Sequence, residues 1–221
     1  MRSSQRPLIQ LALDLIDKEL IKQFSMYSAK AGIDIIEVGT PAIKRFGSDI
    51  VKEIRELIGE RQTILADTKT LDASKIEVEI MASAGANIVT VMGFASDETF
   101  YEALEAADKN NIEIWADMMY LKDPVERAIQ LKEIGVKTVI LHVGIDVQKR
   151  RGVSGEILVD EVRRVSSQGI RVAVAGGLDP SKGEYLFRNG ASVIIIGGWV
   201  TKSSDWINRI DEIVKTFNKY R

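Results

Sequence analysis

The 221-residue sequence contains no cysteine, so it can form neither a disulfide nor a thiolate site. It also has no run of eighteen apolar residues, which is about the length that a membrane-spanning helix requires. The first ten residues, MRSSQRPLIQ, lack the apolar core of a secretory signal peptide. Together these absences predict a cytoplasmic protein without a membrane partner.

The sequence also lacks a long block of one charge. Its formal net charge is −2, with 30 basic and 32 acidic residues mixed along the chain. Proteins that bind nucleic acid usually carry a basic surface, so this balance argues against a nucleic-acid partner. Hydrophobic residues make up 45% of the chain, which is enough for a sizeable core. We expect one domain that spans residues 1–221.

Short apolar runs alternate with longer amphipathic stretches along the whole chain. The runs are residues 8–14, 34–39, 63–69, 87–93, 113–119, 138–144, 171–177 and 193–199. Strands that are separated by helices must be parallel, because each helix carries the chain back to the starting edge. Eight such units predict an α/β fold with a single closed (β/α)8 TIM barrel. A doubly wound open sheet is the alternative, but the first strand lacks a glycine-rich fingerprint and the eighth unit is complete.

The stretches between the runs carry helical periodicity. Apolar residues recur at helical spacing in residues 17–30, 49–58 and 156–165. Asp97 and Asp123 stand where N-caps are expected, and Pro124 suits the first turn of a helix. Residues 144–155 read as the longest loop. In a barrel this loop would lie on the face where active sites are built.

Six ionisable side chains stand at or near the carboxyl ends of the predicted strands. They are Asp14, Glu37, Asp67, Lys69, Asp117 and His142. Barrel strands are buried on both faces, so charged side chains belong at the strand ends, and the carboxyl ends form the functional rim. Asp67 and Lys69 are two residues apart and therefore share a face of their strand. Six such groups at one rim predict an active site.

Structural roles are the alternative for each of these residues. Asp67 and Lys69 could form an ion pair that only stabilises the fold, although stability alone rarely accounts for buried pairs. Asp72 could cap the helix that follows, and Asp14 could cap the turn after the first strand. His142 is the single histidine and could be a core residue with satisfied hydrogen bonds.

Two glycine pairs follow the last two strands. Gly176 and Gly177 close the seventh strand, and Gly197 and Gly198 close the eighth. These ends are neighbours in a barrel and commonly form a phosphate site, because glycine lets backbone N–H groups approach the phosphate oxygens. Plain turns are the alternative.

Several motifs together resemble the 3-hexulose-6-phosphate synthase family. They are LALD, EVGTP, the D-x-K-x-x-D of Asp67, Lys69 and Asp72, the H-x-G-x-D-x-Q that begins at His142, VAVAGG and VIIIGG. The likeness runs from about residue 6 to residue 205. The D-x-K-x-x-D motif alone is also similar to 3-keto-L-gulonate-6-phosphate decarboxylase and, in variant form, to orotidine phosphate decarboxylase.

The resemblance implies an aldehyde-lyase of the ribulose monophosphate pathway. Its reaction would be a reversible, Mg²⁺-dependent aldol addition of formaldehyde to D-ribulose 5-phosphate, which gives D-arabino-hex-3-ulose 6-phosphate. A carboxy-lyase of the keto-gulonate type is the near alternative, but such enzymes carry arginines where this chain has Ile145 and Trp199. A non-catalytic sugar-phosphate-binding barrel is the alternative of another class.

The resemblance also implies a role for each rim residue. Glu37 and Asp67 would hold Mg²⁺, and Asp67 and Lys69 would act in catalysis. Lys69 would stabilise an enediolate as an ammonium group, because a protonated amine is a poor Schiff-base nucleophile. His142 would bind substrate and transfer the C1 proton, and Asp14 would bind a substrate hydroxyl.

The remaining implied roles concern Asp72 and the glycines. Asp72 would be a catalytic residue that reaches into the neighbouring subunit's site, which implies a homodimer with shared active sites. The four residues Gly176, Gly177, Gly197 and Gly198 would hold the substrate phosphate.

Overall fold

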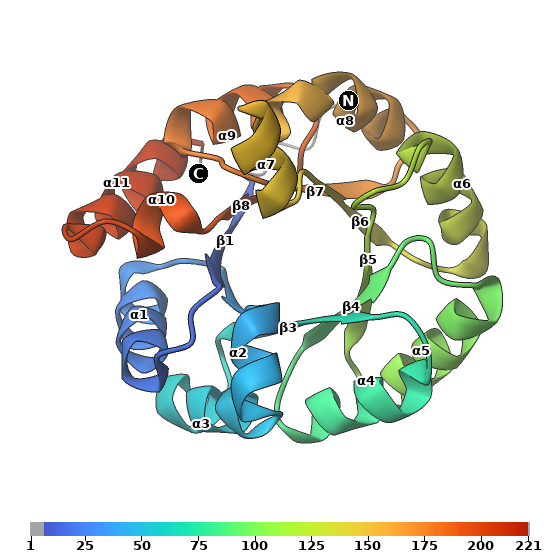
Figure 1. The fold of residues 1–221 in the computed structure, drawn as a ribbon, viewed down its shortest axis with the longest axis horizontal. Coiled ribbons are helices and arrows are strands. Elements are labelled where there is room, and N and C mark those ends of the chain that lie inside the picture. Colours follow the sequence, from blue (N-terminus) through green and yellow to red (C-terminus); the bar gives the residue numbers. More distant parts are fainter. Residues whose placement is uncertain (1–6, 221) are drawn as a thin grey trace.

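Eight parallel strands close into a barrel in the computed structural model, which describes residues 7–220 (Figure 1). The strands are β1 (Leu8–Leu13), β2 (Ile35–Val38), β3 (Thr63–Thr70), β4 (Ile88–Met92), β5 (Glu113–Asp117), β6 (Thr138–His142), β7 (Arg171–Ala175) and β8 (Val193–Ile196). Each strand pairs with the next, and β8 pairs with β1. The predicted (β/α)8 barrel is therefore confirmed, and the open sheet is excluded.

Helices surround the barrel, and most of them cover its outer surface (Figure 1). They are α1 (Lys18–Ala31), α2 (Thr40–Phe46), α3 (Asp49–Ile58), α4 (Ser74–Ser83), α5 (Asp97–Asn110), α6 (Pro124–Ile134), α7 (Ile145–Arg151), α8 (Val159–Ser167), α9 (Pro180–Arg188), α10 (Gly198–Thr201) and α11 (Trp206–Asn218), with a 3₁₀ turn, η1 (Gly155–Leu158), before α8. None of the helices within residues 7–220 is long and apolar enough to cross a membrane. Of the ten residues MRSSQRPLIQ, in which no signal peptide is expected, residues 1–6 lie outside the described residues. The assignment of residues 1–221 to one domain stays a prediction.

The two predicted N-caps have different outcomes. The Asp123 carboxylate accepts hydrogen bonds from backbone N–H groups of the first turn of α6, and Pro124 opens that helix as predicted. The prediction for Asp97 is wrong, because Ser96 caps α5 and its Oγ accepts from the Thr99 N–H at 3.2 Å. Asp97 is instead the first residue of the helix. Its negative charge there interacts favourably with the positive end of the helix dipole.

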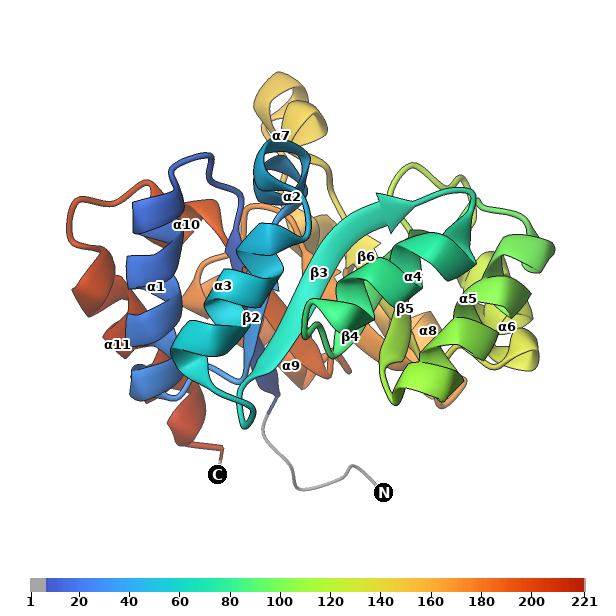
Figure 2. The same cartoon turned by 90° about the horizontal axis from the view of Figure 1, so that it is seen from below.

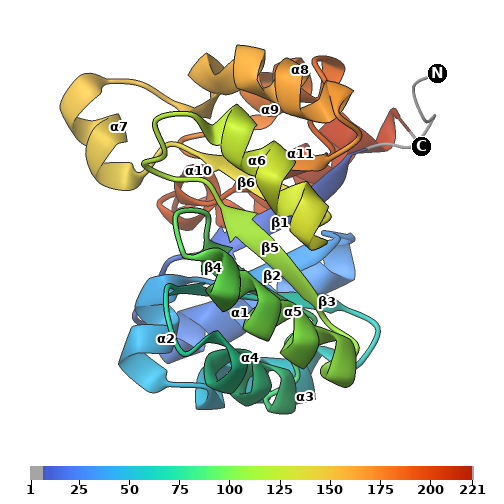
Figure 3. The same cartoon turned by 90° about the vertical axis from the view of Figure 1, so that its right-hand side faces the viewer.

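The interpretation of residues 144–155 as one loop is also wrong. The segment contains α7, which closes at Gly152 with a φ of 65°. None of the residues of α7 is buried, so the helix shows no apolar stripe that a sequence pattern could reveal. Figures 2 and 3 show α7 standing away from the barrel, beyond the strands' carboxyl ends.

The barrel interior is a packed apolar layer. Its buried members are Ala12, Ile35, Leu65, Ile88, Trp115, Ile140, Ala173, Ala175, Val193 and Ile195. Arg171 closes the layer from the amino-terminal side, because its guanidinium pairs with Glu113 and donates to Thr138 Oγ1 at 2.6 Å. The ionisable side chains of the predicted site lie above this layer, at the carboxyl ends of the strands.

Candidate active site

Lys69 occupies a distorted part of β3. The pairing of β3 with β4 shifts register between Ala66 and Thr70, and the φ of Lys69 is 51°. A positive φ in a residue other than glycine costs on the order of 1–3 kcal/mol and is found mostly at functional sites. Thr90 holds the distortion in place, because its Oγ1 accepts the Lys69 backbone N–H at 3.0 Å. The bulge aims the Lys69 ammonium into the mouth of the barrel.

The Lys69 ammonium lies between two carboxylates. Its Nζ is 2.8 Å from Asp67 Oδ2 and 3.0 Å from Asp117 Oδ2. Burial opposes the charge on Lys69, but the neighbouring charges of Asp67 and Asp117 outweigh it and raise the pKa of the amine. The group is therefore a fixed ammonium at neutral pH. This contact agrees with the prediction that Asp67 and Lys69 share a face.

Asp117 connects this ion pair to the histidine. Its Oδ2 also lies 3.0 Å from His142 Nδ1, and its Oδ1 accepts the Met119 N–H at 3.0 Å. Burial would raise the pKa of Asp117, but His142 and Lys69 overcome this effect and hold the pKa well below its ordinary value. A carboxylate at Nδ1 leaves Nε2 as the free nitrogen of the imidazole. His142 is thus oriented for proton transfer at Nε2.

Asp67 is held by several donors. Its Oδ1 accepts from Thr90 Oγ1 at 2.8 Å, and Lys69 Nζ contacts both of its oxygens. Thr40 Oγ1 lies 2.8 Å from Oδ2 and 2.7 Å from the Asp67 carbonyl oxygen, so one hydroxyl is shared between them. The carboxylate is therefore fixed in position by two hydroxyl groups and one ammonium group.

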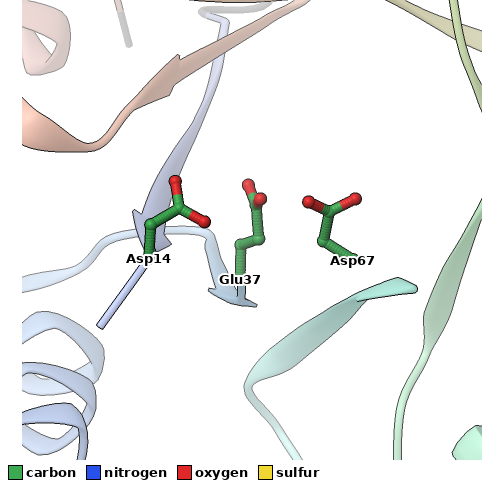
Figure 4. Close-up of side chains that lie close together, drawn as sticks. All are labelled: Asp14, Glu37 and Asp67. Carbon is green, nitrogen blue, oxygen red and sulfur yellow. The ribbon is translucent and has the colours of Figure 1, made fainter. Parts of the chain in front are cut away.

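Three carboxylates cluster beside Lys69. Asp14, Glu37 and Asp67 each place one oxygen within 4.8 Å of the others. Figure 4 shows the three side chains side by side, with Glu37 in the middle. Burial raises the pKa of Glu37 well above its ordinary value, and the charges of Asp67 and Asp14 raise it further. Burial and the charge of Asp67 also raise the pKa of Asp14, although its side chain opens toward solvent at the rim. Full ionisation of the three carboxyl groups is therefore unfavourable unless a proton or a cation compensates their negative charge.

The composition of this cluster fits a hard divalent cation. All three side chains offer oxygen, which is the ligand atom that Mg²⁺ prefers, and neither histidine nor cysteine belongs to the group. Asp14 accepts no hydrogen bond from any described residue, and Glu37 accepts only one, from Gln10. Asp14 and Glu37 therefore keep free lone pairs, whereas Asp67 could take an ion only by releasing part of its contact with Lys69.

Replacing Glu37 by glutamine is expected to stabilise the metal-free protein at alkaline pH. Because its pKa in the folded state lies above the ordinary value of 4.5, ionisation of Glu37 costs the folded state free energy. This cost is absent below pH 4.5, grows as the pH rises, and is complete above the folded-state pKa. Each 1 kcal/mol relieved raises Tm by about 2–4 °C.

Thermal unfolding of Glu37→Gln and wild type in EDTA, at pH 4.5 and pH 8.5, checks this prediction. The Tm difference should be close to zero at pH 4.5 and positive at pH 8.5. Glu56→Gln, which neutralises an exposed carboxylate on α3, should show no such trend. A difference that is the same at both pH values would contradict the assignment of the raised pKa to Glu37.

The predicted phosphate glycines lie where β7 and β8 end. Gly176 and Gly177 have φ values of 113° and 63°, and a Cβ at Gly176 would lie 2.6 Å from the Val143 carbonyl oxygen. Gly197 and Gly198 form the start of the four-residue helix α10. Gly177 also lines a cavity of about 440 Å³, whose basic side chains are Lys149, Lys182 and Lys202. The arrangement offers backbone N–H groups and positive charge to an anion.

Asp72 does not join the other predicted site residues. It is exposed, and Ala73, not Asp72, precedes α4, with no side-chain cap. The alternative that Asp72 caps this helix is therefore wrong. The turn-cap alternative for Asp14 is wrong as well, since none of the described N–H groups donates to its carboxylate. Asp72 is free to contact another molecule.

Three polar side chains support the site without having been predicted. They are Thr40, Thr90 and Gln10, which hold Asp67, Lys69 and Glu37 respectively. Sequence reasoning also gave Asp117 no role beyond its place near the rim, although the structure puts it between Lys69 and His142. The sequence feature that could have indicated a role for Asp117 is its position at the carboxyl end of β5.

Comparisons with known proteins cover nearly the whole barrel. A family model described as orotidine 5'-phosphate decarboxylase / HUMPS family matches residues 7–213. A 3-hexulose-6-phosphate synthase of Staphylococcus aureus is 33% identical over 199 residues, which are 89% of this chain and 92% of the relative.

Two solved structures are similar in fold and sequence. One is 3-hexulose-6-phosphate synthase from Salmonella typhimurium, with a TM-score of 0.90, 28% identity, and coverage of 98% of this chain and 100% of that one. The other is KGPDC from Streptococcus mutans, with a TM-score of 0.84, 26% identity, and coverage of 98% of this chain and 99% of that one. The residues that the family model matches include the whole acidic cluster, Lys69 and His142.

Proposed function

Because the chain belongs to the orotidine 5'-phosphate decarboxylase / HUMPS family and is an enzyme of the lyase class, we propose that it is a formaldehyde-fixing aldolase. The reaction is the reversible addition of formaldehyde to C1 of D-ribulose 5-phosphate, which gives D-arabino-hex-3-ulose 6-phosphate. The observation that carries the proposal is the ammonium of Lys69 fixed between Asp67 and Asp117, beside the carboxylates of Asp14 and Glu37.

This arrangement suits an enediolate. Removal of a proton from C1 of the ketose places negative charge on the neighbouring oxygen, and a preorganised ammonium stabilises that charge in a site partly shielded from water. The raised pKa of Lys69 keeps the amine protonated, so it acts by its charge and does not form an imine. The carbon nucleophile then attacks formaldehyde, and the new alkoxide takes up a proton.

Mg²⁺ is the proposed cofactor, with Glu37 and Asp67 as its protein ligands and Asp14 as the residue that binds a substrate hydroxyl. The all-oxygen composition of the cluster and the raised pKa values of Glu37 and Asp14 support this assignment. A bound divalent cation would supply Lewis-acid charge to the substrate oxygens. Asp67 would then contribute one oxygen to the ion and keep the other toward Lys69 and Thr90.

His142 is the proposed acid–base group for the C1 proton, since the Asp117 carboxylate leaves its Nε2 free. Replacing His142 by asparagine is expected to slow exchange of the C1 proton of ribulose 5-phosphate with solvent by roughly 10²-fold or more. Proton NMR in D₂O measures this exchange without formaldehyde. An exchange rate equal to that of the wild type, in a variant with an unchanged Tm, would remove His142 from the mechanism.

The phosphate of the substrate is proposed to bind at Gly176, Gly177, Gly197 and Gly198. The positive φ values at Gly176 and Gly177 and the basic cavity at Gly177 support this placement. The substrate then spans the mouth of the barrel, with its phosphate at β7 and β8 and its C1 at the carboxylates of β1 to β3. The two ends of the proposed substrate therefore match the two halves of the rim.

A homodimer with shared active sites is proposed from the position of Asp72. This side chain is exposed and does not reach the other rim residues of its own chain. Mixing inactive Asp72→Ala with inactive Lys69→Ala chains is expected to restore about a quarter of wild-type activity. Half of the dimers would then be mixed, and each would contain one intact site out of two.

The mixture must be unfolded and refolded together, so that subunits exchange. Each variant refolded alone is the control and should remain inactive. No recovery in a mixture that contains mixed dimers, detected by a tag on one variant, would show that each chain contains its whole site.

Apolar residues stand at the two positions where the keto-gulonate decarboxylases carry arginine. Ile145 is the first residue of α7 and is exposed, and the ring of Trp199 lies 4.1 Å from the Arg209 guanidinium that stacks on it. Neither side chain offers a cation to a substrate carboxylate. This favours the aldolase over the carboxy-lyase.

The direct test measures formaldehyde released from D-arabino-hex-3-ulose 6-phosphate. We expect release that depends on enzyme and on Mg²⁺, with no CO₂ formed from 3-keto-L-gulonate 6-phosphate. Decarboxylation of the second substrate without turnover of the first would support the carboxy-lyase. Tight sugar-phosphate binding without turnover of either substrate would support a binding protein.

A further inference from the structure

Gln10 is a fully buried amide in the barrel interior. It lies on β1, two residues before Ala12, and is 0% exposed. The layer around it is apolar and includes Ile35, Val193 and Ile195. Transfer of an amide into such surroundings is unfavourable unless hydrogen bonds satisfy both of its polar atoms. The presence of Gln10 therefore needs an explanation.

Only one of these polar atoms has a partner. Gln10 Nε2 donates to Glu37 Oε2 at 2.5 Å, whereas Gln10 Oε1 is buried without a hydrogen-bond partner among the described residues. An unsatisfied buried acceptor destabilises a protein, and an aliphatic side chain of similar size would avoid it. The stability of the barrel therefore does not account for an amide at this position.

The contact to Glu37 does account for it. Gln10 fixes Oε2, and Oε1 of the same carboxylate accepts no hydrogen bond from any described residue. Glu37 stands between Asp14 and Asp67 in the acidic cluster (Figure 4). Without Gln10, the buried carboxylate would have no donor to resist its rotation away from two like charges. The amide thus holds Glu37 in the cluster with one oxygen free.

We propose that Gln10 is a positioning residue, which holds Glu37 in place to bind a divalent cation. This inference rests on the proposed metal role of Glu37. Residues that orient a metal ligand typically change metal affinity by about 10- to 100-fold when they are replaced. Gln10 should therefore contribute to affinity for the ion although it does not touch it.

The test is Gln10→Leu, which removes the amide and keeps an apolar side chain of similar size. Titration of the substrate-free protein with Mn²⁺, followed by electron paramagnetic resonance, gives the affinity independently of activity. We expect Kd for Mn²⁺ to rise about 10- to 100-fold, while Tm in EDTA stays equal to or above that of the wild type. Saturating Mg²⁺ should restore most of the turnover.

Ser28→Ala is the matched control. Ser28 is also fully buried, and its Oγ is the other unpartnered buried side-chain atom among the described residues. It lies on α1, away from the acidic cluster, so its removal should leave the affinity for Mn²⁺ unchanged. The pair of variants separates loss of a buried polar atom from loss of the contact to Glu37.

The outcomes distinguish this inference from the proposed function. If the wild type does not bind Mn²⁺, the metal role itself is wrong. If the wild type binds Mn²⁺ and Gln10→Leu binds it equally well, only the role of Gln10 is wrong. Gln10→Met serves as a second, unbranched variant in case leucine disturbs the core. A parallel fall of Tm and affinity in both variants would mean that Gln10 acts only by supporting the barrel.

Discussion

Replacing Lys69 by alanine is expected to lower the aldolase rate by about 10²- to 10³-fold, with the loss mainly in kcat. The ammonium is fixed between Asp67 and Asp117 and kept protonated by them, so its charge is in place before the enediolate forms. An interaction of this kind is strongest in the transition state, and its loss lowers kcat more than it raises KM. Steady-state measurement of formaldehyde release checks this expectation.

Two further measurements isolate the charge of Lys69 from its packing. Lys69→Met keeps the length of the side chain without the ammonium and should be as inactive as Lys69→Ala. Lys75→Ala removes a lysine of α4 that lies outside the site and should retain full activity. Borohydride added with substrate should leave no adduct on Lys69. A trapped adduct, or more than a tenth of the wild-type rate in Lys69→Met, would contradict the electrostatic role.

Removal of divalent cations is expected to reduce activity to background, a loss of about 10³-fold or more for an effect of several kcal/mol. The carboxylates of Asp14, Glu37 and Asp67 lie close together at the rim. Burial, together with the charges of neighbouring carboxylates, raises the pKa values of Glu37 and Asp14. A cluster without an ion would repel the negative charge that develops on the substrate. Dialysis against EDTA followed by assay in metal-free buffer measures the effect.

Readdition of Mg²⁺ should restore the rate, whereas Na⁺ at the same ionic strength should not. EDTA presaturated with Mg²⁺ is the control for nonspecific effects of the chelator. A full rate in metal-free buffer would refute the metal role of Glu37 and Asp67, but it would leave the role of Lys69 to be judged by its own variants.

The barrel could be predicted from the sequence because its strands are buried on both faces. Runs such as residues 193–199 are continuously apolar, and their regular alternation with helices leaves few topologies open. The same burial explains why charged side chains in these strands indicate a functional site. A side chain such as Glu37, which follows two isoleucines in a core strand, has few structural reasons to be there.

The contacts between the site residues could not be predicted in the same way. Asp117 on β5 meets His142 on the adjacent strand β6 and Lys69 on β3, which are 25 and 48 residues away in the sequence. The left-handed backbone of Lys69 arises from a bulge that depends on pairing with β4. Gln10 reads as one more residue of a strand until its amide is seen against Glu37. Tertiary structure alone determines these contacts.

The helix α7 could not be predicted from the sequence either. It has no buried face, so no periodicity marks it, and the glycines on either side resemble loop residues. Its basic residues Lys149, Arg150 and Arg151 are exposed, and Lys149 lines the cavity at Gly177. Amphipathic patterning detects only helices that pack against a core.

The most direct test of the account is a crystal structure with Mn²⁺ in place of Mg²⁺ and D-ribulose 5-phosphate, with the ion located by its anomalous signal. We expect the ion to coordinate carboxylate oxygens of both Glu37 and Asp67, and the sugar oxygens at C1 and C2 to face it and Lys69. An ion bound elsewhere on the barrel, with the sugar phosphate seated at the rim, would contradict the claim that these carboxylates prepare the site for an enediolate.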